Sequence, residues 1–198
     1  MGHAGTLDPM ASGVLLVCVG RGATREVSRL QALEKEYEGV VRLGIQTDTD
    51  DLEGKVVQEK AVPVLTQEDV EKTLGEFCGE IWQVPPVFSA LVVKGRKSYD
   101  LARRGKAVHF QARKVFVKSI EVTSFALPRI GLRVVCGKGT YIRALARDLG
   151  KRLGTCGMLE KLVRTRIGPY ELKQSWTLDV LRKLAGEKRL EEAVIAFP

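Results

Sequence analysis

The chain has 198 residues, of which 44% are hydrophobic, and none of its apolar runs approaches the ~20 residues that a membrane-spanning helix needs. Its four cysteines, Cys18, Cys78, Cys136 and Cys156, are scattered without a C-x-x-C pair, which argues against a metal site or a disulfide framework and for a reducing, cytoplasmic setting. The formal net charge of +8 favours a polyanionic partner such as a nucleic acid, because a basic surface speeds encounter and releases counterions on binding.

Residues 2–13 predict a loop that carries one carboxylate. The segment is rich in Gly, Ala, Ser and Thr, and Pro9 directly follows Asp8, so it is too glycine-rich for a helix and too broken for a strand interior. The apolar run 14–19 predicts a buried strand that anchors the loop. Asp8 is therefore a candidate reactive group, and the alternative is a turn aspartate that binds its own backbone.

The next two segments differ in polarity. Residues 36–43 alternate between apolar and polar side chains, which predicts a strand with Tyr37 near its start. Residues 47–54 are acidic and rich in turn formers, but they lack the third acidic ligand and the glycine of a calcium-binding loop. We expect a solvated loop there.

The region 66–105 predicts two helices around a rigid connector. Thr66 and Asp69 have the spacing of a capping box, and the helix that they open is expected to close at Gly79. Two consecutive prolines make 83–90 an extended connector rather than a central strand. Residues 98–105 predict a short second helix.

The second half of the chain predicts a hairpin and then two helices. Residues 113–125 and 130–136 are long strands joined around Pro128, and a one-residue phase slip between Val117 and Ile120 indicates a bulge. Residues 140–153 form the clearest helix, whose buried stripe is expected to hold Ile142, Leu145, Leu149 and Leu153. Its second face is expected to hold Arg143, Arg147 and Lys151, at spacing four.

A last short helix is expected over 176–184, entered through Thr177. Helices and strands mix without strict β-α-β alternation, which favours an α+β fold on a mixed, largely antiparallel sheet with flanking helices. We expect residues 1–175 to form one domain and residues 176–198 a helical extension of it.

Several motifs carry a resemblance to a known family. Residues 2–13, Gly-His-Ala-Gly-Thr-Leu-Asp-Pro-Met-Ala-Ser-Gly, resemble the catalytic motif G-H-x-G-T-L-D-P-x-A-[ST]-G of the TruB-type tRNA pseudouridine synthases. Four further blocks are similar to the family's and follow in its order, within residues 35–50, 83–90, 138–150 and 162–168. The resemblance runs to about residue 180 and implies a pseudouridine synthase fold, in which a catalytic cleft crosses the central sheet.

The resemblance also implies an activity and its residues. The family isomerises uridine to pseudouridine without a cofactor, and we expect position 55 in the TΨC arm of tRNA as the target. Asp8 would act as nucleophile at C1′ or as base at C2′, and the sequence leaves the two routes open. Arg143 would pair with Asp8 and orient it, and Tyr37 would stack on the uracil and handle its C5 proton.

Further positions match the family's substrate-binding residues. Tyr141 and Leu162 would line the uracil pocket, and His3 would assist extrusion of the target base. Candidate contacts to the RNA backbone are Lys138, Arg147, Lys151, Arg103 and Arg104. The alternatives are ordinary ones: a packing role for Tyr37, a core position for Leu162, and a solvated basic face for the cations.

Relative to the family, the motif stands unusually close to Met1 and the tail stops early. We therefore expect a catalytic domain that lacks the family's N-terminal segment and its small C-terminal RNA-binding module. The leading hypothesis is a monomeric tRNA pseudouridine synthase without metal or cofactor. The second is a non-catalytic RNA-binding or RNA-folding protein on the same scaffold.

Overall fold

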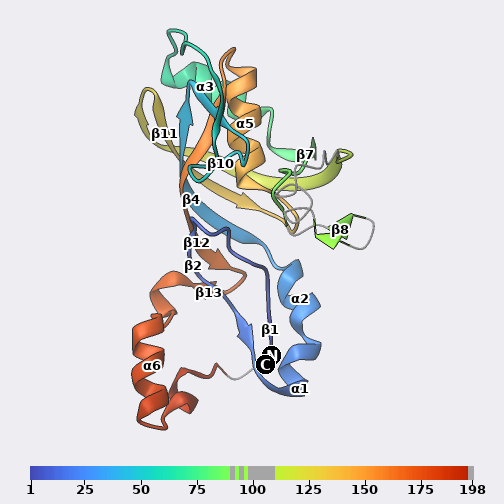
Figure 1. The fold of residues 1–198 in the computed structure, drawn as a ribbon, viewed down its shortest axis with the longest axis vertical. Coiled ribbons are helices and arrows are strands. Elements are labelled where there is room, and N and C mark those ends of the chain that lie inside the picture. Colours follow the sequence, from blue (N-terminus) through green and yellow to red (C-terminus); the bar gives the residue numbers. More distant parts are fainter. Residues whose placement is uncertain (90–91, 94–95, 98–109, 196–198) are drawn as a thin grey trace.

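The computed structural model describes residues 1–89, 92–93, 96–97 and 110–195, and its central feature is a seven-stranded sheet (Figure 1). The order is β13-β12-β4-β11-β10-β7, and β2 pairs with β12 off this path. The strands are β2 (Ser12–Gly13), β4 (Lys35–Leu43), β7 (Gly79–Gln83), β10 (Arg113–Ala126), β11 (Arg129–Cys136), β12 (Gly157–Ile167) and β13 (Tyr170–Glu171). Only the β2–β12 pair is parallel within this sheet, which confirms the predicted α+β class and the mixed, largely antiparallel pairing.

Short strands and helices complete the described part of the chain. Two-stranded pairs are formed by β1 (Gly2–His3) with β3 (Val17–Cys18), β5 (Ile45–Thr47) with β6 (Val56–Glu59), and β8 (Val92–Val93) with β9 (Arg96–Lys97). The helices are α1 (Gly20–Arg25), α2 (Val27–Ala32), α3 (Gln67–Gly75), α5 (Ile142–Arg152) and α6 (Leu178–Gly186), with 3-10 turns at Leu172–Gln174 and Leu190–Ala193. None of the described helices is long and apolar enough to cross a bilayer.

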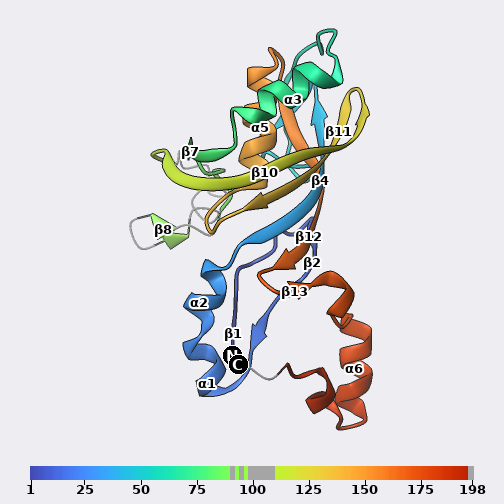
Figure 2. The same cartoon turned by 180° about the vertical axis from the view of Figure 1, so that it is seen from behind.

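The main core lies between one face of this sheet and the helices α3 and α5, which lie together at one end of the molecule (Figure 2). Buried side chains alternate with exposed ones along the strands, as in β4, where Val41 and Leu43 are buried and Glu38 is exposed. On the opposite, charged face, Arg133 forms ion pairs with Glu38 and Glu121. A sheet with one packed and one solvated face is typical of antiparallel pairing.

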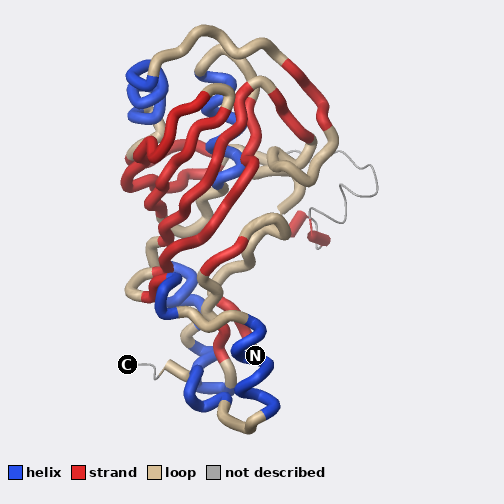
Figure 3. The backbone as a smooth tube through the Cα atoms, turned by 90° about the vertical axis from the view of Figure 1, so that its left-hand side faces the viewer, coloured by secondary structure: helices blue, strands red, loops and turns tan. Residues whose placement is uncertain are grey.

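A second, smaller cluster lies at the other end of the molecule, beside α1, α2 and β1 (Figure 3). Its buried members are Ala4, Cys18 and Leu30. The N-terminal strand therefore packs far from α3, and the Asp8 segment runs from this cluster towards the main sheet.

The predicted strand 14–19 is wrong in its extent. Only Val17–Cys18 form a strand, and Leu15, Val17 and Val19 are exposed whereas Val14 and Cys18 are buried. The segment is extended, and its side chains alternate in direction, so a wholly apolar run does not become a wholly buried one.

Most of the predicted helices and the bulge are confirmed. The capping box of Thr66 and Asp69 is present at α3, and a register shift follows Val117 in β10. The helix α3 ends at Gly75 rather than Gly79. The next three residues bond instead to the carbonyl three positions earlier, as in a 3-10 turn, and Cys78 lies on the surface. The predicted helix 98–105, with Arg103 and Arg104, lies outside the described residues.

Candidate active site

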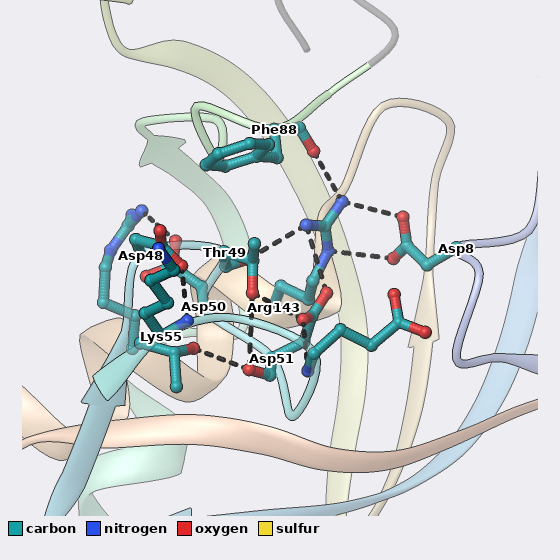
Figure 4. A network of polar contacts seen from close by, with 11 residues as sticks. Asp8, Asp48, Thr49, Asp50, Asp51, Lys55, Phe88 and Arg143 are labelled. Carbon is teal, nitrogen blue, oxygen red and sulfur yellow. Dashed lines mark hydrogen bonds and ion pairs between the residues drawn. The ribbon is translucent and has the colours of Figure 1, made fainter. Parts of the chain in front are cut away.

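The Asp8 carboxylate and the Arg143 guanidinium form a bidentate pair. Arg143 Nε donates to Asp8 Oδ2 at 3.0 Å and Nη2 donates to Asp8 Oδ1 at 2.7 Å (Figure 4). The Arg143 side chain is 4% exposed, whereas that of Asp8 is 29% exposed. The expected pairing is therefore present, and it leaves the carboxylate partly accessible from outside.

The remaining N–H groups of Arg143 are also bound. Nη1 donates to the Thr49 carbonyl at 2.9 Å and lies 3.3 Å from the Asp51 carboxylate, and Nη2 donates to the Phe88 carbonyl at 3.0 Å. A guanidinium has five N–H donors in one plane, and here four hydrogen bonds and the ion pair with Asp51 surround it. The orientation of Arg143, and through it that of Asp8, is thus fixed by three separate segments of the chain.

The helix α5 brings Arg143 to this place because it is buried on nearly every side. Gly150 approaches β12 so closely that a Cβ on it would lie 2.3 Å from backbone atoms of Cys156 and Gly157. At the N-terminal end, the buried Gln83 side chain accepts from the Tyr141 N–H and donates to the Tyr141 carbonyl, at 2.8 and 3.1 Å. Both contacts set the position of the first helical turn.

The loop that carries Asp8 is fixed by a buried arginine that sequence reasoning missed. Arg164, on β12, is 2% exposed, and it donates to the Val14 carbonyl at 2.7 Å and to the Gly5 carbonyl at 3.1 Å. Gly13 has a φ of 113°, and a Cβ there would lie 2.2 Å from the Arg164 carbonyl oxygen. Only glycine permits this close approach, so the loop lies directly on β12.

The acidic segment 47–54 is not the solvated loop that the sequence predicts. Asp50 and Asp51 are 6% and 2% exposed, and backbone hydrogen bonds to both sides of Leu159 attach the turn to β12. Carboxylates are seldom buried without cationic partners, and Arg143 and Arg147 supply them. The two carboxylates are therefore buried because they neutralise two buried guanidinium groups.

The structure also differs from the expectation for Arg147. It was expected to contact the RNA backbone, but its residue is 9% exposed and its guanidinium binds Asp50, Asp148 and the Val84 carbonyl. Its donors are already used inside the protein. Of the other cations proposed for this role, Lys138 and Lys151 are exposed, and the remaining pair falls outside the described residues.

Tyr37 lies near the pair, on β4 opposite Arg164 in the register. Burial raises the pKa of its hydroxyl above the ordinary value, and Asp8 adds to the rise while Arg164 opposes it. Burial likewise raises the pKa of Tyr141. Both phenols therefore stay protonated beyond the pH range of an ordinary tyrosine and can donate hydrogen bonds.

The other proposed substrate residues differ in setting. Leu162 is 6% exposed and belongs to the main core, as the alternative interpretation allowed. His3 is exposed on β1, where it pairs with Val17, and within the described residues no hydrogen bond or ion pair joins its side chain to Asp8 or Arg143. In the described part of the chain no three His, Cys, Asp or Glu side chains are grouped as metal ligands would be.

One sequence pattern could have revealed that Arg147, Asp50 and Asp51 are buried. Arg143 and Arg147 flank the apolar stripe of a helix that also contains Ala144, Ala146 and Gly150, so the helix has little polar surface left for solvent. Arginines on such a helix need acceptors within the protein, and the acidic turn is the most charged segment upstream. By contrast, nothing in the local sequence marks Arg164 or Gln83 as buried.

Two family models match the chain. One, described as the N-terminal domain of TruB family pseudouridylate synthases, matches residues 1–142, and the other, described as the C-terminal domain of tRNA pseudouridylate synthase B, matches residues 143–196. Their boundary falls within the first turn of α5, directly before the arginine that binds Asp8.

Curated relatives carry the same description. The tRNA pseudouridine synthase B of Francisella tularensis subsp. tularensis is 43% identical over 191 residues, which cover 96% of this chain and 63% of that protein. The protein of the same name from Phocaeicola vulgatus is 42% identical over 194 residues, which cover 98% and 82%. The chain thus spans less than two thirds of the length of the first relative.

Solved structures resemble this fold over nearly the whole chain. A crystal structure of a Cbf5-Nop10-Gar1 complex aligns with a TM-score of 0.70 at 30% identity, covering 98% of this chain and 50% of the other. A structure of an H/ACA RNP bound to a substrate RNA containing 2′-deoxyuridine aligns with a TM-score of 0.66 at 28% identity, covering 97% and 49%.

Proposed function

Because this chain belongs to the TruB family of pseudouridylate synthases, we propose that it isomerises uridine to pseudouridine in tRNA. We further propose a uridine of the TΨC arm as the target and Asp8 as the reactive carboxylate. The observation that carries the proposal is the bidentate Asp8–Arg143 pair, with 29% of the Asp8 side chain exposed. This arrangement orients a carboxylate while leaving it accessible to a substrate.

The reaction needs one well-placed carboxylate and no external group. The bond from N1 of uracil to C1′ breaks, the base turns, and C5 bonds to C1′; the proton lost from C5 is balanced by one gained at N1. Asp8 attacks C1′ or removes a proton at C2′, and in either route it stabilises a sugar with oxocarbenium character. Arg143 prevents the carboxylate from rotating away from the sugar.

The base would lie against Tyr37 and Tyr141. Both phenols are protonated at neutral pH, as tyrosines ordinarily are, and burial, which raises their pKa, keeps them so; each can donate a hydrogen bond to a carbonyl of uracil. The Tyr37 hydroxyl is also the group proposed to handle the C5 proton. Leu162 would close the pocket from the core side, and His3 would assist extrusion of the nucleotide.

The test uses tRNA whose uridines carry tritium at C5, because C5 loses its proton during the reaction. We expect the protein to release tritium, and Asp8→Asn to abolish release while tRNA affinity changes little, since the substitution keeps the size of the side chain and removes its charge and one of the two acceptors of Arg143. Asp179→Asn, on the exposed face of α6, is the matched control and should release tritium at the unaltered rate.

Two results would contradict the proposal. Release that persists in Asp8→Asn would remove Asp8 from the chemistry. Binding of tRNA without any release by the unaltered protein would favour the second hypothesis, a non-catalytic RNA-binding or RNA-folding protein. Cleavage of the product with a base-specific ribonuclease, followed by analysis of each fragment for pseudouridine, would place the modified position inside or outside the TΨC arm.

A further inference from the structure

The second buried arginine of α5 has partners on three segments. Arg147 Nη1 donates to the Asp50 carboxylate at 2.9 Å, and Nη2 donates to the Val84 carbonyl at 2.9 Å. Nε and Nη2 donate to the neighbouring Asp148 at 2.8 and 3.1 Å. The Arg147 side chain is 10% exposed and that of Asp50 is 8% exposed, so this pair is shielded from solvent and salt.

Arg143 and Arg147 bind the same two segments, one helical turn apart. On the acidic turn, Arg143 holds the Thr49 carbonyl and Arg147 holds the next residue, Asp50. On the connector after β7, Arg143 holds the Phe88 carbonyl and Arg147 holds a carbonyl four residues earlier. The two arginines therefore cross-link α5 to the same two segments, and of the two only Arg143 also binds Asp8.

We propose that Arg147 is a positioning residue for the reaction at Asp8. By fixing residues 47–51 and 84–88 relative to α5, it keeps their acceptors where the Arg143 guanidinium needs them. This inference rests on the proposed function, because it assigns Arg147 to the orientation of the same reactive carboxylate. It differs from a direct catalytic role, since the hydrogen bonds of Arg147 go to Asp50, Asp148 and the Val84 carbonyl rather than to Asp8, and its side chain is 10% exposed.

The backbone of the acidic turn gives a reason for the second cross-link, the ion pair of Arg147 with Asp50. Asp50 has a φ of 59°, in the left-handed region, which aspartate and asparagine tolerate better than other non-glycine residues but which still costs backbone energy that the packed surroundings offset. Its neighbours Thr49 and Asp51 supply the acceptors of Arg143 Nη1. If the Asp50–Arg147 ion pair is lost, the turn can relax, and the acceptors move away from Arg143.

The test compares three substitutions with a control on the same helix. Arg147→Met removes the charge, Arg147→Lys keeps it but loses the planar fork, and Asp50→Asn keeps a residue that tolerates the left-handed backbone. Arg152→Met is the matched control, because Arg152 lies on α5 in an exposed ion pair with Glu76. Each is assayed in single-turnover tritium release, with tRNA affinity and thermal unfolding measured separately.

For Arg147→Met we expect the single-turnover rate per folded molecule to fall about ten-fold or more, since small displacements of catalytic groups are costly. The Kd for tRNA should stay within about two-fold. The single-turnover rates of Arg147→Lys and Asp50→Asn should also fall, but by less than that of Arg147→Met. Arg152→Met should leave the rate unchanged. In an Arg143→Lys background, Arg147→Met should have little further effect, because Arg147 acts through Arg143.

A readout without activity separates this inference from the proposed function. The Arg143 Nε–H proton, which donates to Asp8, should be sharp and slow to exchange in the NMR spectrum of the unaltered protein. In Arg147→Met it should exchange about ten-fold faster or more, and in Arg152→Met it should not change. If the unaltered protein releases no tritium, the proposed function fails, and this arm alone decides the role of Arg147.

Three outcomes would overturn the inference. One is a lowered melting temperature with an unaltered rate per folded molecule, which assigns Arg147 to stability alone. Another is full additivity with Arg143→Lys, and the third is an unaltered Arg143 signal. If Arg147→Met does not fold, Asp50→Asn carries the same comparisons, and an unaltered rate and signal in that variant would likewise overturn it.

Discussion

Each side chain around the proposed reaction has its state set by what it touches. Asp8 is partly exposed while Arg143 is held by four hydrogen bonds and the ion pair with Asp51, so the carboxylate can react and the guanidinium is kept from turning. Burial disfavours the charged forms of Tyr37 and Tyr141 and raises their pKa further above neutral pH. The chemistry available at the site is therefore that of an oriented, partly exposed carboxylate.

The raised pKa of Tyr37 predicts a pH dependence of stability. The folded state holds this proton more tightly than the unfolded state, whose value is the ordinary 10.0. The contribution is therefore complete below about pH 10 and is lost as the pH rises from there through the folded pKa. In urea titrations at increasing pH, the unaltered protein should lose stability relative to Tyr37→Phe only above about pH 10. A divergence of the two proteins already near pH 8 would contradict the burial of this hydroxyl.

Among the elements, α5 decides the geometry of the site. Its contact with β12 depends on Gly150, whose Cα leaves no room for a side chain against the Cys156–Gly157 backbone. The contact sets the height of the helix above the sheet, and hence the place of Arg143 two turns earlier. A helix displaced outwards by one methyl group would carry both arginines away from the acidic turn.

Gly150→Ala should therefore destabilise the protein although it replaces glycine within a helix. Overpacking of this kind costs about 1–3 kcal/mol of unfolding free energy, which exceeds the gain of roughly 0.5–1 kcal/mol expected for Gly to Ala in a helix. Gly75→Ala is the control: Gly75 ends α3, and a Cβ there meets nothing within 4 Å. Urea unfolding followed by circular dichroism measures both, and equal effects of the two substitutions would contradict the close approach.

The molecule as a whole is elongated, with the main core at one end, the small N-terminal cluster at the other and the Asp8 segment between them (Figure 1). Its net charge of +8 suits the polyanion that the proposed function requires. Part of that charge is not free for RNA, because Arg143, Arg147 and Arg164 are buried. We expect the proposed binding of RNA to use exposed cations such as Lys138, in the turn before α5.

This charge predicts a steep salt dependence of tRNA binding. The logarithm of the affinity should fall linearly with the logarithm of salt concentration, as phosphate contacts release counterions. Lys138→Gln should remove one phosphate contact and so reduce the magnitude of the slope by about 1. Lys72→Gln, on the exposed side of α3, should not alter the slope. Fluorescence anisotropy over a salt series measures the slopes, and identical slopes for all three proteins would exclude a phosphate contact at Lys138.

Much of the fold followed from local patterns, whereas the site followed only in part. The apolar stripe of α5, the capping box of α3 and the bulge in β10 each depend on residues within a few positions of one another, and all three were predicted. The run 14–19 misled because an apolar run does not say how many partners a strand has. Asp50 and Asp51 misled because burial of a carboxylate depends on cations about ninety positions away.

The order of residues alone fixed the periodicity of the helices and strands, the glycines that let the Asp8 loop bend, and the motif that names a family, because these are short-range properties. Spacing placed Arg143, Arg147 and Lys151 on one face of the helix, and only the family resemblance singled out Arg143 as the partner of Asp8; the burial of Arg147 was not predicted. The folded arrangement brought Asp8, 135 positions distant, to one guanidinium and Asp50 to the other. Buried charges find their partners in space, and that pairing forms only when distant segments pack together.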